Sequence, residues 1–168
     1  DNKDYKTALE YIERTMYFIP EDTAILMNAG VFFAPAAKEF DKSIDYIRKY
    51  QKKGGKSSDA YIQLFSIYRD NKKDLVTALA VAKEAMAAFP NNTEFPKYEL
   101  DIYIKTDRLP EARTIMEKQA KENPTDKEAR YYCGVINMEL KDNAAALTWF
   151  DEALKLDPKY FEAHLAKA

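Results

Sequence analysis

The chain has 168 residues and a formal net charge of −2; 46% of its residues are hydrophobic and 32% are charged. This balance allows a packed core and excludes wholesale disorder, and the lack of a basic stripe argues against nucleic acid as a partner. No apolar run approaches the roughly 18 residues that cross a bilayer, so the sequence predicts no membrane insertion. With only 4 Gly and 7 Pro, the chain has few turn residues for an all-β protein, and we expect helices.

The N-terminal segment, residues 1–20, is predicted to form one helix that ends at Pro20. Its phrase "DYKTALEYIERTMYFIP" places Ala8 ahead of Pro20 at an offset that recurs further along the chain. We therefore expect 1–20 to be the second helix of a partial unit. Because a helix begins at the first residues, we also expect the chain to have been cut from a longer protein.

Residues 23–58 are predicted to form a pair of helices. The first covers "TAILMNAGVFFA" with the small residue Gly30, and the second covers "KEFDKSIDYIRKYQKK" with Ser43. Gly54 and Gly55 stand where the other units have proline, and we expect them to end the second helix, because glycine adopts a positive φ without a steric penalty. The next helix is predicted to begin near Ser58 or Asp59, which both suit an N-cap.

The Gly55-Lys56-Ser57 tripeptide in the same stretch also ends the phosphate loops of nucleotide-binding proteins. Such a loop needs a first glycine five residues before its last one and a strand ahead of it. Tyr50 occupies the position of that first glycine, and the preceding segment is predicted to be helical. The sequence therefore favours a gap between two helices over a nucleotide site.

Proline and alanine recur at a fixed period in the rest of the chain. Three prolines lie 34 residues apart, and an alanine precedes each at a constant offset; the positions are Pro90, Pro124 and Pro158 with Ala78, Ala112 and Ala146. This period predicts stacked two-helix units. The predicted units are 59–92, 93–126 and 127–160, and 161–168 begins a further unit or forms a capping helix.

The last full unit is predicted to have a capping box at Thr125 and Glu128 before its first helix. Cys133 falls on an inward position of that helix, where we expect a small buried hydrophobe more than a reactive thiol. His164 is the only histidine and is expected to pack, not to catalyse. One histidine and one cysteine cannot make an ordinary zinc site, and no catalytic motif is present. The sequence thus predicts neither an enzyme nor a cofactor.

The 34-residue pattern resembles the tetratricopeptide repeat family. In the last full unit the likeness rests on Gly134, Ala146, Phe150, Ala153 and Pro158. The resemblance implies an all-α, right-handed α-solenoid of antiparallel helix pairs that covers nearly the whole chain. Residues 93–126 depart from the family's pattern, since Leu100 stands at the small position and Glu99 at a large apolar one. We expect the first helix of that unit to be shifted or rotated slightly.

The resemblance also implies a partner-binding concave surface lined by the first helix of each pair. The family's groove-facing offsets fall on Met27, Asn28, Val31, Gln63, Leu64, Ile67, Lys97, Tyr98, Asp101, Tyr131, Tyr132, Val135 and Met138. Some family members hold the carboxylate of a chaperone tail with basic and amide side chains at these offsets. Of the residues above only Lys97 is basic, so no carboxylate-tail clamp is expected, and a semi-apolar peptide or helix is the better guest. For Tyr98 and Tyr132, packing between adjacent helices is the alternative interpretation.

The predicted function is a non-catalytic scaffold or adaptor for protein–protein interaction. One alternative is an accessory or regulatory region of a larger enzyme or signalling protein, and another is a self-association module that pairs through its terminal helices. A single cysteine, Cys133, forbids an internal disulfide, which fits the cytoplasm and does not exclude the periplasm.

Overall fold

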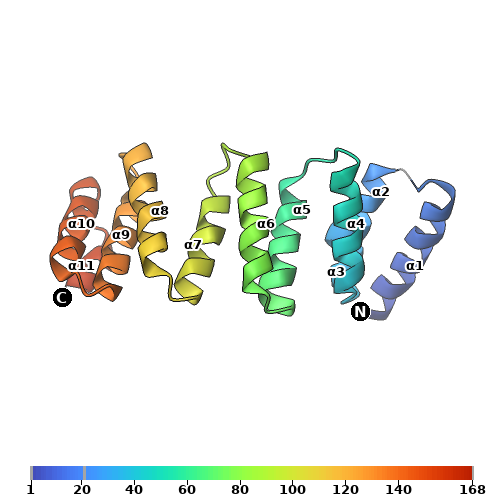
Figure 1. Cartoon of the computed structure of the whole chain (residues 1–168), viewed down its shortest axis with the longest axis horizontal. Helices are drawn as coiled ribbons and strands as arrows, with labels where there is room; N and C mark the ends of the chain where they lie inside the picture. The colour runs from blue at the N-terminus through green and yellow to red at the C-terminus, as the bar shows by residue number, and fades with distance from the viewer. Residues whose placement is uncertain (1, 21, 168) are drawn as a thin grey trace. The chain divides into compact units, whose positions relative to one another are not determined.

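The computed structural model describes residues 2–20 and 22–167, and these are almost entirely helical (Figure 1). No strand occurs in these two ranges, as the composition predicts. The chain divides into two compact units, residues 1–95 and 96–168.

The first unit contains α1 (Asn2–Phe18), α2 (Thr23–Asn28), η1 (Ala29–Phe33), α3 (Ala34–Ala36), α4 (Phe40–Lys52), α5 (Ser58–Ser66), η2 (Ile67–Asn71) and α6 (Leu75–Ala88). Here η1 and η2 are π-helical turns that continue α2 and α5 without a break. As a result α2, η1 and α3 together form the long first helix that the sequence predicts over 23–34. This helix packs on α4, and α5 packs on α6.

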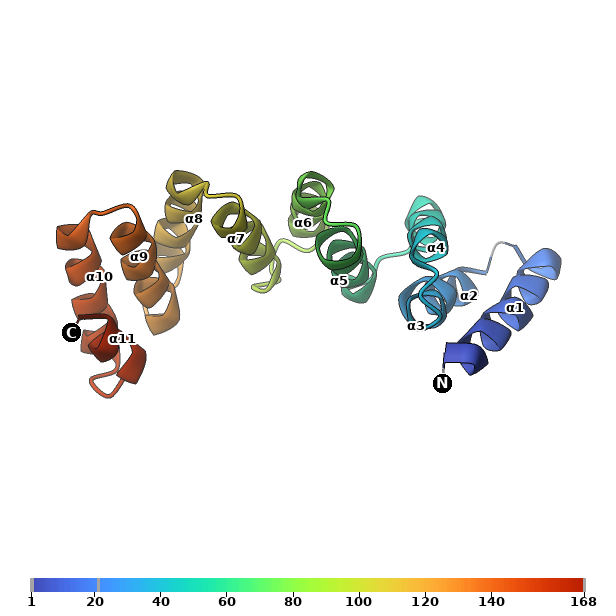
Figure 2. The same cartoon turned by 90° about the horizontal axis from the view of Figure 1, so that it is seen from below.

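The second unit contains α8 (Leu109–Glu122), α9 (Lys127–Glu139), α10 (Asn143–Leu156) and α11 (Phe161–Lys167), preceded by α7 (Phe95–Lys105), which starts on the last residue of the first unit. α9 packs against α8 on one side and α10 on the other, as Figures 1 and 2 both show. α11 packs on α10 and on α9. Pro96 lies in the first turn of α7, where a missing backbone N–H is tolerated.

The turn inside each helix pair has the same backbone geometry. A residue with positive φ ends the first helix, and the next residue is the N-cap of the second. The positive-φ residues are Lys38 (62°), Lys73 (56°), Asp107 (56°) and Lys141 (64°). None is glycine, although the left-handed region is costly for a residue that has a Cβ.

Small residues allow the two helices of a pair to approach each other closely. At Gly134 an added Cβ would collide with the ring of the buried Phe150, and at Gly30 it would lie 2.7 Å from Ile47 Cγ1. Along the sequence, the separation between Gly30 and Ile47 is one residue longer than that between Gly134 and Phe150. The π-helical turn η1 adds one residue to its turn and so keeps the small residue in register.

Three local details concern the ends of helices. Gly54 adopts a φ of 83° just after α4, which confirms the predicted glycine stop. α5 begins at Ser58, which confirms the predicted start, and the residue at its N-cap is Ser57. The predicted capping box at Thr125 and Glu128 is wrong, because Asp126 caps α9 by accepting a hydrogen bond from the Ala129 N–H at 2.9 Å.

Candidate functional site

The residues predicted to line a partner-binding surface differ widely in exposure. Val31, Leu64 and Ile67 are buried, which corrects their assignment, because side chains covered by neighbouring helices cannot contact a partner. Leu64 and Ile67 lie on a helix that packs on α6, α4 and η1. The half-buried members are Met27, Gln63, Tyr98, Asp101, Tyr131 and Val135, and the exposed members are Asn28, Lys97, Tyr132 and Met138.

In the second unit the structure brings the predicted α9 residues together on one side of that helix. Tyr131, Tyr132, Val135 and Met138 follow one another at intervals of one, three and three residues, which places them along one helical face. Tyr132 is 44% exposed. We call these four residues the α9 face.

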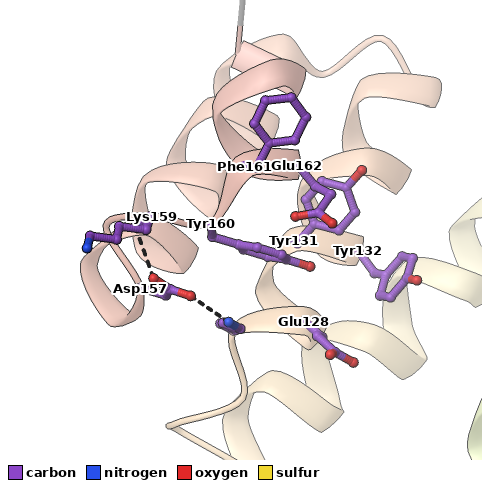
Figure 3. A pocket seen from close by; sticks show the side chains of 9 residues that line it. Glu128, Tyr131, Tyr132, Asp157, Lys159, Tyr160, Phe161 and Glu162 are labelled. Atoms are coloured by element: carbon purple, nitrogen blue, oxygen red, sulfur yellow. Dashed lines mark hydrogen bonds and ion pairs between the residues drawn. The ribbon is translucent and has the colours of Figure 1, made fainter.

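The N-terminal end of the α9 face opens into a pocket of about 670 Å³. Figure 3 shows its walls, which come from the first half of α9, from the turn after α10 and from the start of α11. The lining residues are Lys127, Glu128, Tyr131, Tyr132, Asp157, Lys159, Tyr160, Phe161 and Glu162.

Tyr131 is the centre of the aromatic side of this pocket. Its ring centroid lies 5.4 Å from that of Tyr132 and 5.5 Å from that of Tyr160, both in edge-to-face geometry. It also lies 5.9 Å from the ring of Phe150, which belongs to the core. Pairs of this kind stabilise the arrangement beyond simple burial and hold the rings in place.

The charged side of the pocket is organised by Asp157. Its carboxylate accepts a hydrogen bond from the Lys159 backbone N–H at 3.0 Å and forms a 2.5 Å ion pair with Lys127 Nζ. These hydrogen bonds, from Lys127 first, lower the pKa of Asp157 below its usual value. The same ammonium lies 4.9 Å from the centroid of the Tyr160 ring.

Burial, and after it the nearby carboxylates of Glu162 and Glu128, raise the pKa of the Tyr160 hydroxyl to about 12. The tyrosine is therefore neutral at physiological pH. The two carboxylates make the surroundings of this hydroxyl electronegative, which suits a cation better than an anion.

Sequence reasoning predicted Tyr131 and Tyr132 but missed Tyr160, Phe161 and the charged residues around them. The predicted positions lie only on the first helix of each pair, whereas this pocket is completed by residues of the turn after α10 and of α11. A weak signal was present, because Tyr160 follows Pro158 by two residues and so lies at the start of the following helix.

A second pocket lies in the first unit beside α1 and α4. Glu13 lines it and accepts hydrogen bonds from Lys42 Nζ at 2.8 Å and from the Tyr46 hydroxyl at 2.7 Å. None of the residues predicted for partner binding lines this pocket. Its polar contacts join α1 to α4, which indicates a structural role.

The other residues considered for catalysis, metal binding or nucleotide binding lie in surroundings that do not support these roles. Cys133 is fully buried, as predicted, and burial raises the pKa of its thiol to about 12, which keeps it protonated. His164 is exposed and not packed as predicted, and its Nε2 lies 2.9 Å from the Pro158 carbonyl oxygen. Within 2–20 and 22–167, no three His, Cys, Asp or Glu side chains are grouped as a metal site would require. The Gly55-Lys56-Ser57 tripeptide joins helices α4 and α5, whereas a phosphate loop follows a strand.

Over the described ranges, every helix is too short or too polar to span a bilayer.

Comparison with solved structures places the fold among known repeat proteins. YrrB, described as a TPR protein with an unusual peptide-binding site, superposes with a TM-score of 0.69 at 19% identity, covering 98% of this chain and 84% of that one. MamA gives 0.68 at 17% identity over 94% and 91% of the two chains. The TPR repeats protein BF2334 from Bacteroides fragilis NCTC 9343 gives 0.66 at 20% identity over 98% and 89%. At these identities the likeness concerns the fold.

Sequence comparison supports the same family. No curated protein matches the chain, but two tetratricopeptide repeat profiles do, one over residues 72–131 and one over 127–160. The second match has the bounds of the last unit expected from the proline period. Such repeats are typically protein-interaction scaffolds and not catalysts. The all-helical fold of paired helices, the small residues at their contacts and these matches together show that the chain belongs to the tetratricopeptide repeat family, with the α-solenoid fold of that family.

Proposed function

We propose that the chain is a non-catalytic module that binds a peptide segment or a partner helix of semi-apolar character. The observation that carries this proposal is the α9 face, where Tyr132 and Met138 are exposed beside the half-buried Tyr131 and Val135. Soluble proteins rarely leave such apolar rows uncovered unless something docks on them. Tyrosine and methionine are also enriched at the centres of protein interfaces.

In the second unit the proposed surface consists of the α9 face and of Lys97, Tyr98 and Asp101 on α7. In the first unit the accessible residues Met27, Asn28 and Gln63 form a candidate surface of their own, without the buried Val31, Leu64 and Ile67. The polar members provide hydrogen bonds to a guest, while the aromatic and aliphatic ones provide contact area. The same composition argues against a guest held by its terminal carboxylate.

A selection from a random-peptide display library tests this proposal. We expect enriched peptides whose affinity falls about tenfold or more in Tyr132→Ala, because truncating a tyrosine at an interface centre removes a large contact area. Leu147→Ala is the matched control, because Leu147 is 45% exposed on α10, the second helix of the same pair. Both variants should keep the melting temperature of the wild type.

Two results would contradict the proposal. The first is a library in which no peptide is enriched. The second is an equal loss of binding in both variants, which would place the guest away from the α9 face. A collapse of the melting curve in Tyr132→Ala would instead assign this tyrosine to packing, and Met138→Ala would then be the informative variant.

Self-association through the terminal helices is a second candidate function. Phe18, at the end of α1, is 79% exposed, and α11 exposes Phe161 and Leu165. If these side chains pair two copies, Phe18→Ser or Phe161→Ser should shift the sedimentation of the protein toward monomer at a given concentration. Val76→Ser is the control, because Val76 is 82% exposed on α6, away from both ends. A wild type that is monomeric at all concentrations would exclude this function.

A further inference from the structure

The pocket at the start of α9 combines aromatic rings with charged side chains, and the docking of an apolar segment alone does not require this combination. Three tyrosine rings meet in it, those of Tyr131, Tyr132 and Tyr160. Aromatic faces carry a negative quadrupole that attracts cations within about 6 Å of the ring centroid. The pocket of Figure 3 can therefore attract a cation in addition to making van der Waals contacts.

The aromatic group is built on the core and is not a chance meeting of surface side chains. Tyr131 is half-buried and its ring packs on Phe150, which is itself almost fully buried between α9 and α10. Tyr160 is half-buried as well. Rings supported in this way are already ordered, so a ligand meets a low entropic cost of ordering them.

The electrostatics of the pocket favour a positive guest. Glu128 and Glu162 both line it and are exposed, and neither forms an ion pair with any residue in 2–20 or 22–167. The lining carries three carboxylates against two lysines, so it keeps one excess negative charge even though Lys127 also attracts Glu128 and Glu162. Lys127 is paired with Asp157, and Figure 3 shows the Lys159 amino group pointing away from the tyrosines.

The protein already uses this chemistry once with its own side chains. Lys127 holds its ammonium 4.9 Å from the Tyr160 ring centroid and also donates a hydrogen bond to the carboxylate of Asp157. The exposed ring of Tyr132 lines the same pocket as the carboxylates of Glu128 and Glu162, so a cation from a partner would meet the same two kinds of group there.

We propose that this pocket binds the guanidinium group of an arginine side chain in the partner peptide. A planar guanidinium can stack on a tyrosine ring and at the same time donate hydrogen bonds to carboxylates, and it is less strongly hydrated than an ammonium. Arginine therefore fits this combination of rings and carboxylates better than lysine. The inference rests on the proposed function, because it names one residue that the guest would carry.

A titration followed by NMR tests the pocket directly, without a peptide guest. The probe is N-acetylarginine methylamide, and the neutral control is N-acetylnorleucine methylamide, which has a similar stem without the charge. We expect the arginine compound to shift resonances of Tyr131, Tyr132 and Tyr160 and the norleucine compound to leave them unchanged. The double variant Glu128→Gln/Glu162→Gln should weaken binding at least about fivefold, because it removes both carboxylates.

Glu139→Gln is the matched control for charge, because Glu139 is exposed on α9 outside the pocket. It should bind the arginine compound as the wild type does. Equal shifts with the norleucine compound, or equal affinity in the double variant, would overturn the proposal. Equal binding of N-acetyllysine methylamide would overturn the choice of arginine.

The outcome can be separated from that of the proposed function. Binding of the arginine compound at the three tyrosines, with no peptide enriched from the library, would retain the pocket and reject the module's general role. Suppose instead that the enriched peptides depend on Tyr132 but contain no arginine, and that the arginine compound shifts no resonance. The module's general role would then be retained and the arginine site rejected.

Discussion

At the scale of single residues, the left-handed turn inside each helix pair is a site of strain. Lys141 has a φ of 64° between α9 and α10, a region in which a Cβ costs about 1–2 kcal/mol. Lys141→Gly removes this cost but gives the unfolded chain more freedom, which offsets about 0.4–1 kcal/mol. We therefore expect a net gain of about 0.5–1 kcal/mol in the free energy of unfolding, measured by urea denaturation.

The matched control for Lys141→Gly is Lys118→Gly, because Lys118 is exposed in the middle of α8. There glycine should lower stability by about 0.5–1 kcal/mol, as in any helix interior. If both substitutions lower stability by the same amount, the turn is not strained and the positive φ has no energetic consequence.

At Gly134 we expect substitution to lower the free energy of unfolding, whereas Lys141→Gly should raise it. A Cβ at this position would collide with the ring of Phe150, which cannot move freely because it is buried. Gly134→Ala should therefore cost about 1–3 kcal/mol through overpacking, although alanine favours helix more than glycine does. Urea denaturation measures the loss, and a variant as stable as the wild type would show that the helix pair can separate at no cost.

At the scale of helices, the N-caps differ between pairs in a way that can be measured. Asp142 caps α10 by accepting a hydrogen bond from the Ala145 N–H at 3.1 Å, whereas Arg108 stands at the N-cap of α8 without a side-chain bond. Asp142→Ala should lower the free energy of unfolding by about 1 kcal/mol, and Asp142→Asn should restore most of it. An equal loss in both variants would indicate that the charge matters and the cap does not.

The attachment of α1 to α4 should depend on pH. Partial burial acts to raise the pKa of Glu13, but hydrogen bonds from Lys42 and Tyr46 outweigh it and lower the pKa below its usual 4.5. A carboxyl whose pKa is lower in the folded state contributes stability that is fully present above the unfolded value and lost as the pH falls through the folded value. Wild type should therefore exceed Glu13→Gln in stability at pH 7, and the two should converge at a pH well below 4.5.

Urea midpoints of both proteins at pH 7 and at acid pH provide this measurement. Tyr46→Phe removes one of the two donors to Glu13 and should reduce the difference at pH 7. A difference between wild type and Glu13→Gln that persists unchanged at acid pH would mean that the carboxylate form of Glu13 is not what stabilises α1.

At the scale of the whole molecule, the proline period predicts the ends of α6, α8 and α10, because each of the three prolines follows one of these helices. The family's groove-facing offsets, in contrast, failed for Leu64 and Ile67. Periodicity shows which residues share a helical face, but not how much of that face a neighbouring helix covers. Tyr132, two repeats further on from Leu64, is exposed where Leu64 is buried. The π-helical turns escaped prediction because each continues an α-helix without a break and leaves no mark in the proline period.

The two compact units lead to a prediction about cooperativity. Each unit has its own internal packing, and in repeat proteins a unit is stabilised by its own contacts and those of its nearest neighbours. Gly134→Ala should therefore reduce hydrogen-exchange protection mainly in α8, α9 and α10, while α4 and α6 keep the protection of the wild type. Exchange measured by mass spectrometry on peptic fragments resolves these helices. A uniform loss of protection from α4 to α10 would mean that the chain unfolds as one cooperative body, because a local defect would then destabilise distant helices equally.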